Sequence, residues 1–176
     1  METTEYGFAE SPFGELIVAR TAAGICYLQF VTTTPHEAFD EFRRCWNSDV
    51  RATQNDEMAC KVVKMMFEEH RKDIALDLRG TAFQLKVWAA LQHVPFGQTV
   101  SYRQMACAIG QPAAVRAVAS AIARNPVAVL VPCHRVIHSD GTTGQYHWGA
   151  DLKKRLIRWE YNVTYGPDGH DADTLL

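Results

Sequence analysis

One cysteine in this sequence has neighbours that could make it a nucleophile. Cys133 follows Pro132 at the end of an apolar run rich in β-branched residues, and His134 and Arg135 come directly after it. The thiolate is the nucleophilic form of cysteine, and a neighbouring imidazole or guanidinium favours that form. We expect the run to be a strand that ends at the proline and presents the thiol in a loop.

A carboxylate further along the chain could complete this site. Glu160 lies on the helical run ADLKKRLIRWEY and could orient the imidazole of His134 and stabilise its charge, which would make a Cys-His-Glu relay. Other readings stay open at this point. A lone cysteine after an apolar run is more often a small buried hydrophobe, Glu160 could pair with a neighbouring lysine or arginine, and the same constellation would fit a cysteine hydrolase.

Two short helices are expected before the cysteine. Ser101 can cap the helix YRQMACAI, a turn follows at Gly110, and the run AAVRAVASAIAR is a second helix. Helix, glycine-containing turn and helix form the helix-turn-helix pattern, although many helical hairpins bind nothing. The second helix is rich in alanine and carries two arginines. Its small side chains would allow close approach of a packed helix or of a DNA groove.

The chain before residue 79 predicts a supporting α/β domain without chemistry of its own. Residues 11–31 contain two β-rich runs separated by a small-residue turn that ends at Gly24, which indicates a hairpin. Helices are expected from Pro35 in PHEAFDEFRRCW and over 56–70, where the apolar residues recur at helical spacing. IALDL at 74–78 has the composition of a short strand.

Charge is distributed unevenly along the chain. Residues 1–80 hold nine Lys/Arg against fourteen Asp/Glu, and residues 140–176 hold four against six. Residues 81–139 carry five basic residues and no acidic one. A polyanion such as DNA would be repelled by the two ends and accepted by the middle. A buried alanine-rich segment that avoids carboxylates would show the same distribution.

The composition is ordinary for a soluble globular protein, and the cysteines indicate a reducing compartment. The chain has 176 residues, of which 47% are hydrophobic and 22% charged, and its five cysteines form no close pairs. A disulfide framework or a CxxC zinc site is therefore disfavoured, and we expect no metal. No secretory signal is recognisable, and no apolar run reaches the ~20 residues that span a bilayer. We expect a bacterial or archaeal cytoplasm, or the nucleus of a eukaryote.

From about Thr81 to Tyr161 the sequence resembles the methylated-DNA–protein-cysteine methyltransferases, also called O6-alkylguanine-DNA alkyltransferases. The family signature Pro-Cys-His-Arg-Val stands at 132–136. Four further family features fall at matching distances: Asn125 in ARNPV, Arg116 in VRAVA, Tyr102 in TVSYRQMA, and Glu160 at the end of the last helix. The amino-terminal part matches only in length and coarse pattern.

The resemblance implies an α/β protein of two domains. Residues 1–78 would form a small sheet-and-helix domain of the ribonuclease H-like kind. Residues 81–165 would form a mostly helical domain that contains the helix-turn-helix, binds DNA and accepts the alkyl group. Residues 166–176 would be a flexible tail.

The resemblance also implies a reaction. The protein would bind double-stranded DNA through the minor groove as a monomer, rotate an O6-alkylguanine out of the helix, and transfer its alkyl group to Cys133. O4-alkylthymine would be a weaker substrate. His134, acting through a water, and Glu160 would activate the cysteine, Tyr102 would donate a proton or hydrogen bond, and Asn125 would brace the cysteine's turn. The thioether product would be permanent, and no cofactor would be needed.

Further residues acquire roles by the same resemblance. Backbone groups at Cys133 and Val136 would hold the guanine, and Tyr146, Gln145 and His147 of the 144–148 loop would form the pocket wall. Gln145 and His147 depart from the residues common in the family, which leaves the pocket width open. DNA contacts are expected from the following residues: Ser101, Arg103, Arg116, Ala117, Ala119 and Arg124. Arg116 would fill the gap that the rotated nucleotide leaves in the base stack.

Two features of some relatives are missing from this sequence. We find neither the zinc-ligand pattern of the animal relatives nor the amino-terminal regulatory domain of some bacterial ones, which argues against a sensor-activator role.

Two rival functions stay open. A non-catalytic lesion binder would flip the base without transferring the alkyl group, but such relatives replace the reactive cysteine. A cysteine hydrolase would turn over an ester or peptide and be indifferent to DNA.

Overall fold

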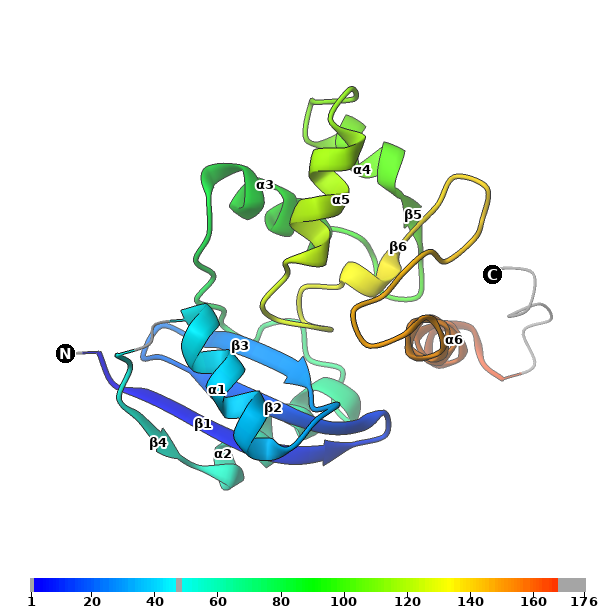
Figure 1. The fold of residues 1–176 in the computed structure, drawn as a ribbon. Helices are drawn as coiled ribbons and strands as arrows, with labels where there is room; N and C mark the ends of the chain where they lie inside the picture. The colour runs from blue at the N-terminus through cyan, green and yellow to red at the C-terminus, as the bar shows by residue number, and fades with distance from the viewer. Residues whose placement is uncertain (1, 47–48, 168–176) are drawn as a thin grey trace. The chain divides into compact units, whose positions relative to one another are not determined.

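The computed structural model describes residues 2–46 and 49–167, which belong to two compact units (Figure 1). The first unit comprises Met1–Arg79 and Pro126–Leu130, and the second comprises Gly80–Asn125 and Val131–Leu176. Most of the tail expected at 166–176 lies outside the described residues. No helix of the described chain is long and apolar enough to cross a membrane.

A four-stranded sheet forms the centre of the first unit. Its strands are β1 (Thr4–Ser11), β2 (Gly14–Arg20), β3 (Ile25–Phe30) and β4 (Ala52–Gln54), in the order β3-β2-β1-β4. β1, β2 and β3 are antiparallel neighbours, and β4 runs parallel to β1. The hairpin expected in 11–31 is confirmed as β2 and β3. The sequence analysis missed β1 and β4.

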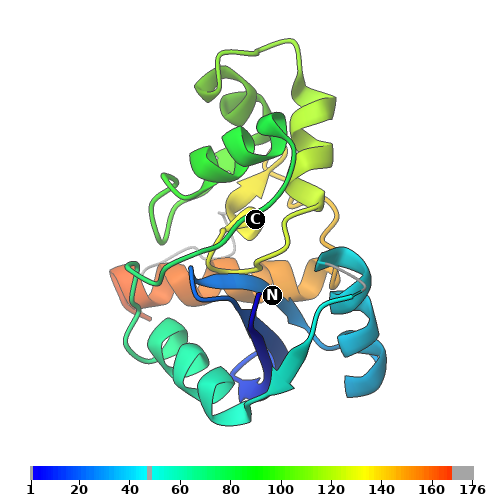
Figure 2. The same cartoon turned by 90° about the vertical axis from the view of Figure 1, so that its left-hand side faces the viewer.

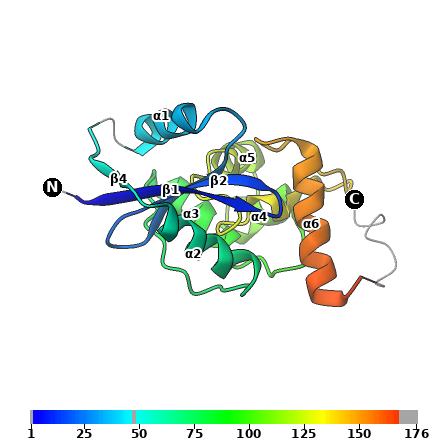
Figure 3. The same cartoon turned by 90° about the horizontal axis from the view of Figure 1, so that it is seen from below.

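The two predicted helices of this unit are confirmed, and they cover opposite faces of the sheet (Figures 2 and 3). α1 spans Pro35–Trp46, and α2 spans Asp56–Phe67, which is three residues shorter at its end than expected. Ile17 packs against Phe42 of α1, and its neighbours Leu16 and Val18 are fully buried as well. Because both faces are covered, β2 reads as a continuous apolar run and not as an alternation.

The strand expected at 74–78 is reduced to an isolated bridge. Leu76 pairs in parallel with Ile25, and the amide of Asp77 donates to the carbonyl of Ile25 at 2.8 Å. The carboxylate of Asp77 accepts a hydrogen bond from the hydroxyl of Thr21 at 2.6 Å. The pairing with β3 is limited to this one bridge, which strand-like composition alone could not reveal.

Four helices and one short parallel strand pair form the second unit. The elements are α3 (Ala82–Leu91), β5 (Val100–Ser101), α4 (Tyr102–Ala108), α5 (Val115–Ala123), the 3-10 turn η1 (Cys133–Arg135), β6 (Val136–Ile137) and α6 (Ala150–Tyr165). β5 pairs with β6 in parallel. The indole of Trp88 in α3 donates to the carbonyl of Ala121 in α5 at 2.9 Å, so α3 supports the helix-turn-helix from inside.

The expected helix-turn-helix is confirmed as α4 and α5. Ser101 caps α4 in a capping box, since its hydroxyl accepts from the amide of Gln104 while the Gln104 side chain accepts from the amide of Ser101. Gly110 provides the positive φ of +75° that the turn requires. α5 begins at Val115, two residues later than expected.

The segment before Cys133 is not the strand that its β-branched residues predicted. Only Val127 makes a bridge, with Leu28 of β3. Two hydrogen bonds hold this bridge: Leu28 donates to the carbonyl of Pro126 at 3.0 Å, and Ala128 donates to the carbonyl of Leu28 at 2.8 Å. The segment Pro126–Leu130 therefore belongs to the first unit although it follows α5.

Two three-residue turns replace the rest of the expected strand. The first is centred on Val129, which has a φ of +68°, and is closed by the amide of Leu130 at 2.8 Å. The second is centred on Pro132, with φ −82° and ψ 65°, and is closed by the amide of Cys133 at 2.8 Å. The second is a common inverse γ-turn, whereas the first is of the rare and strained kind. A β-branched residue at positive φ is a marked backbone outlier.

We expect the strain at Val129 to be measurable. Val129→Gly and Val129→Ala remove nearly the same buried side chain, of which only 9% is exposed, but only glycine tolerates the left-handed backbone. Val129→Gly should therefore unfold in urea with a free energy about 1 kcal/mol higher than that of Val129→Ala. A higher stability of the alanine variant would contradict a strained turn.

Candidate active site around Cys133

Cys133 lies at a pocket that is built within the second unit. The residue opens η1 and is 7% exposed. The pocket has a volume of about 250 Å³ and is lined by Cys133 and the following residues: Tyr102, Ala119, Ile122, Ala123, Asn125, Gln145, Tyr146, His147, Trp148 and Lys153. The helix-turn-helix, the loop before α6 and α6 itself thus all contribute side chains that surround the thiol.

The thiol is protonated at rest because burial raises the pKa of Cys133 above its ordinary value. Three side chains act against burial and lower this pKa: Asn125 and Tyr146 through hydrogen bonds, and Lys153 through its charge. A base is therefore needed to produce the thiolate, and the surrounding groups are placed to stabilise it once it forms.

Both tyrosines of the pocket remain phenols. Burial, and then the neighbouring Cys133, raise the pKa of Tyr146 well above its ordinary value and also raise that of Tyr102. The hydroxyl of Tyr146 is buried and makes no hydrogen bond of standard geometry within the described chain. The two phenols are thus hydrogen-bond donors at neutral pH, one beside the thiol and one from the start of α4.

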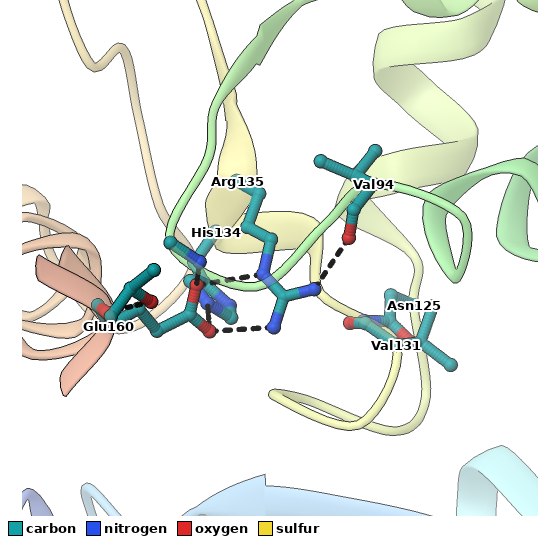
Figure 4. A network of polar contacts seen from close by, with 8 residues as sticks. Val94, Asn125, Val131, His134, Arg135 and Glu160 are labelled. Atoms are coloured by element: carbon teal, nitrogen blue, oxygen red, sulfur yellow. Dashed lines mark hydrogen bonds and ion pairs between the residues drawn. The ribbon is translucent and has the colours of Figure 1, made fainter. Parts of the chain in front are cut away.

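The buried carboxylate of Glu160 binds both His134 and Arg135 (Figure 4). Glu160 of α6 lies with Oε1 at 2.7 Å from Nε2 of His134. Arg135 donates from Nε to Oε2 and from Nη2 to Oε1, both at 2.8 Å. The amide of Gly97 donates to Oε2 at 3.3 Å. Every side of the carboxylate is therefore engaged, as a buried charge requires.

Glu160 stays ionised in spite of its burial. Burial by itself raises the pKa of Glu160, but the charge of His134 and the hydrogen bonds from His134 and Arg135 outweigh it and hold the pKa at about 2. The carboxylate fixes a proton on Nε2 of His134. The opposite nitrogen, Nδ1, is buried and has no hydrogen-bond partner among the described residues. In the neutral imidazole Nδ1 is then the basic nitrogen, able to take a proton.

Arg135 does not stabilise the thiolate of Cys133, contrary to the expectation from its place in the sequence. Two of its nitrogens bind Glu160, and Nη1 donates to the carbonyl of Val94 at 2.7 Å. A carboxylate offers the planar guanidinium two acceptors at once, which a thiol cannot do. Arg135 therefore ties η1 to α6 and to the loop after α3.

The cation that acts on the thiol is Lys153, which the sequence analysis missed. It is only 1% exposed, and its Nζ donates to the carbonyl of Thr143 at 2.5 Å. Burial lowers the pKa of Lys153 to about 8, while the charge of Cys133 acts to raise it. The sequence contained a pattern that could have indicated the burial of Lys153. Lys153, Ile157 and Glu160 share one face of α6, and charged residues on an apolar helix face call for buried partners.

Asn125 holds the turn that carries the cysteine. Its Nδ2 donates to the carbonyl of Val131 at 2.7 Å, and the side chain is buried. Val136, in contrast, is fully buried in β6, pairs with Val100 and does not line the pocket.

The loop after β6 forms one wall of the pocket. Gln145 and His147 are exposed, and both line the pocket. The ring of Trp148 lies edge-on to both neighbouring rings, with its centroid 5.0 Å from that of Tyr146 and 4.9 Å from that of His147. This wall is therefore an aromatic cluster, and Trp148 is a member that the sequence analysis did not single out.

The residues expected to touch DNA lie on or beside the helix-turn-helix. Arg116, Ala117 and Arg124 are exposed on α5 or at its end, and Arg103 is exposed on α4. Ala119 is half-buried and lines the pocket. The exposed face of α5 thus has small side chains between two arginines and adjoins the pocket. The remaining candidate, Ser101, already uses its hydroxyl in the cap of α4.

No metal site accompanies these groups in the part of the chain that the structure describes. No group of three or more His, Cys, Asp or Glu side chains lies close enough there to hold an ion. All five cysteines are free thiols, and Cys26 is buried with its pKa raised to about 12 by burial.

Two parts of the chain match the models of two domains of one protein family. Residues 5–79 match the 6-O-methylguanine DNA methyltransferase, ribonuclease-like domain, and residues 82–162 match the DNA binding domain of the same family. A methylated-DNA–protein-cysteine methyltransferase of Mycolicibacterium paratuberculosis is 39% identical over 158 residues, covering 89% of this chain and 92% of the relative. One of Methanosarcina barkeri is 35% identical, covering 89% and 97%.

A longer relative and two solved structures are similar as well. The bifunctional transcriptional activator/DNA repair enzyme Ada of Escherichia coli is 38% identical over 88% of this chain, which spans about half (45%) of that relative. The crystal structure of Mycobacterium tuberculosis O6-methylguanine methyltransferase has a TM-score of 0.75 at 31% identity, covering 98% of this chain and 99% of that one. The M. tuberculosis OGT in complex with DNA has a TM-score of 0.74 at 33% identity, covering 90% and 93%.

Removing the positive charge beside the thiol should slow its reactions. Lys153→Met keeps the length of the side chain but leaves Cys133 without its neighbouring cation, so the pKa of the thiol should rise further. We expect alkylation of Cys133 by iodoacetamide at pH 7.5 to slow by roughly 10-fold, which corresponds to about one pKa unit. The matched control is Lys154→Met, at an exposed position on the same helix. Equal rates for both variants would contradict the assignment.

Stability should depend on the ionisation of Glu160. The pKa of its carboxyl is about 2 in the folded protein against 4.5 as the ordinary value, so its contribution of roughly 3 kcal/mol is present above pH 4.5 and disappears as the pH falls toward 2. Glu160→Gln should therefore be much less stable than the wild type in urea at pH 7, and this difference should shrink at pH 3. A difference that is unchanged between the two pH values would refute it. Glu57→Gln, at an exposed position, is the control.

Proposed function

The chain belongs to the O6-methylguanine DNA methyltransferase family, and on this basis we propose that it repairs DNA by moving the alkyl group of O6-alkylguanine onto its own Cys133. The observation that carries the proposal is the pocket around this thiol. The pocket joins a buried nucleophile to two phenols, to Lys153 and to the exposed small-residue face of α5. A nucleophile beside a DNA-binding helix is what repair by direct transfer requires.

The proposed reaction starts at the resting thiol. His134 takes the thiol proton, through a water, on the nitrogen that faces away from Glu160, and the carboxylate stabilises the resulting imidazolium. Lys153, Asn125 and the hydroxyl of Tyr146 stabilise the thiolate, as their effects on its pKa indicate. The sulfur then attacks the alkyl carbon in line.

The bond from the alkyl carbon to O6 breaks as the bond from sulfur to carbon forms, and the electron pair remains on the guanine. Tyr102 donates a hydrogen bond or proton to the base as this charge develops, and the proton first taken from the thiol restores the balance. The product is a thioether, which no group of the pocket can reverse. One protein molecule therefore repairs one lesion, and O4-alkylthymine would be a poorer substrate for the same thiolate.

Access to the base requires that the nucleotide leave the helix, because a buried thiol cannot reach a substituent inside a duplex. We propose that α5 enters the minor groove and that Arg116 takes the place of the rotated nucleotide. The alanines of α5 support this role, since Ala117 is exposed and Ala119 lines the pocket, so the groove and the pocket would meet at one helix. Arg124 and Arg103 would bind phosphates.

An intact-mass spectrum tests the proposal directly. The protein is mixed with a duplex that contains one O6-methylguanine and is then digested for peptide mapping. We expect one methyl group to replace the thiol hydrogen of Cys133, saturating at one per protein. Cys133→Ser should bind the duplex but gain no mass.

The alternatives give different results in the same experiment. Tight binding of the lesion without any gain of mass in the wild type would favour a non-catalytic lesion binder. Repeated turnover of an ester or peptide without DNA would favour a cysteine hydrolase. Either result would overturn the transfer of an alkyl group to Cys133.

A further inference from the structure

The register of the two short strands in the second unit places a histidine beside Tyr102, which lines the pocket. β5 and β6 are parallel, with Val100 paired to Val136 and Ser101 to Ile137. The next residue after β5 is Tyr102 and the next after β6 is His138, so the same register places these two side by side. Their ring centroids are 5.2 Å apart and the ring planes are inclined by 43°. No sequence motif pairs these residues, because the contact depends on the strand pairing.

The backbone of His138 is held at both ends. Its amide donates to the carbonyl of Thr142 at 2.9 Å, and its carbonyl accepts from the amide of Gly141 at 3.0 Å. Asp140 closes the same turn, since its carboxylate accepts from the amide and the hydroxyl of Thr142 at 2.9 and 2.7 Å. The imidazole therefore projects from a well-defined turn although the residue is exposed.

The imidazole of His138 occupies space beside Gly144 that a side chain at position 144 would fill. Gly144 has a φ of +69°, and a Cβ built on it would lie 2.5 Å from Nε2 of His138. The ring of His138 is thus between Tyr102 and the start of the loop that carries Gln145 and Tyr146 into the pocket wall. One side chain contacts both the phenol at the pocket and the base of its wall.

We propose that His138 is a positioning residue, which holds the ring of Tyr102 in the orientation that the transfer requires. The inference rests on the proposed function, because it concerns the hydroxyl that would meet the departing guanine. Tyr102 is only half-buried and is the first residue of α4, so its ring depends on the rings and chains beside it. The ring also has Nζ of Lys153 at 5.8 Å from its centroid. Small displacements of a catalytic group have large effects on rate.

The test separates binding from transfer. The dissociation constant for a duplex with one O6-methylguanine and the single-turnover transfer rate at saturating duplex are measured for His138→Ala and His138→Phe. We expect His138→Ala to bind within about twofold of the wild type and to transfer roughly 10-fold more slowly. His138→Phe keeps a ring against Tyr102 and should recover most of the rate. His93→Ala, at an exposed histidine after α3, is the control.

A double-mutant cycle identifies Tyr102 as the group through which His138 acts. In a Tyr102→Phe background the hydroxyl is absent, so adding His138→Ala should cost little more. The proposal is overturned if His138→Ala transfers at the wild-type rate, if binding falls together with the rate, if His138→Phe is as slow as His138→Ala, or if the cost is the same in both backgrounds. A wild type that transfers no methyl group would instead refute the proposed function itself.

Discussion

The site depends on the hydrogen bonds and ion pairs of one buried carboxylate, that of Glu160. A charge taken out of water is tolerated only when every part of it is paired, and Glu160 meets this condition with His134, Arg135 and the amide of Gly97. These partners come from η1 and from the loop after α3, while the carboxylate comes from α6. The same contacts that satisfy the charge therefore set the orientation of the imidazole and attach the cysteine's turn to the last helix.

The surroundings of the Cys133 thiol have opposing effects on its ionisation. Burial keeps Cys133 protonated, and a protonated thiol is less open to oxidation than a thiolate. Its neighbours Lys153, Asn125 and Tyr146 nevertheless lower the cost of ionisation. The reactive thiolate is thus favoured only in combination with a base, which is compatible with the transfer proposed above.

The chain just before the nucleophile alternates between the two units. Val127 pairs with Leu28 of β3, the strained turn at Val129 follows, and Asn125 binds the carbonyl of Val131. The chain thus leaves the second unit after Asn125, pairs once with the sheet of the first unit, and returns to the second unit at Val131.

The sequence by itself determined what depends on near neighbours. The cap at Ser101, the hairpin, the helices and the order of the family signature all rest on residues a few positions apart, and they could be predicted for that reason. Tertiary structure alone decided the partners of the charged side chains. Arg135 lies only two residues after Cys133 but binds Glu160, while Lys153, twenty residues after Cys133, acts on the thiol. The run Val127–Val131 has the composition of a strand, yet long-range pairing leaves it one bridge. A buried charge takes the partner that packing places beside it, and adjacency in the chain cannot specify which one that is.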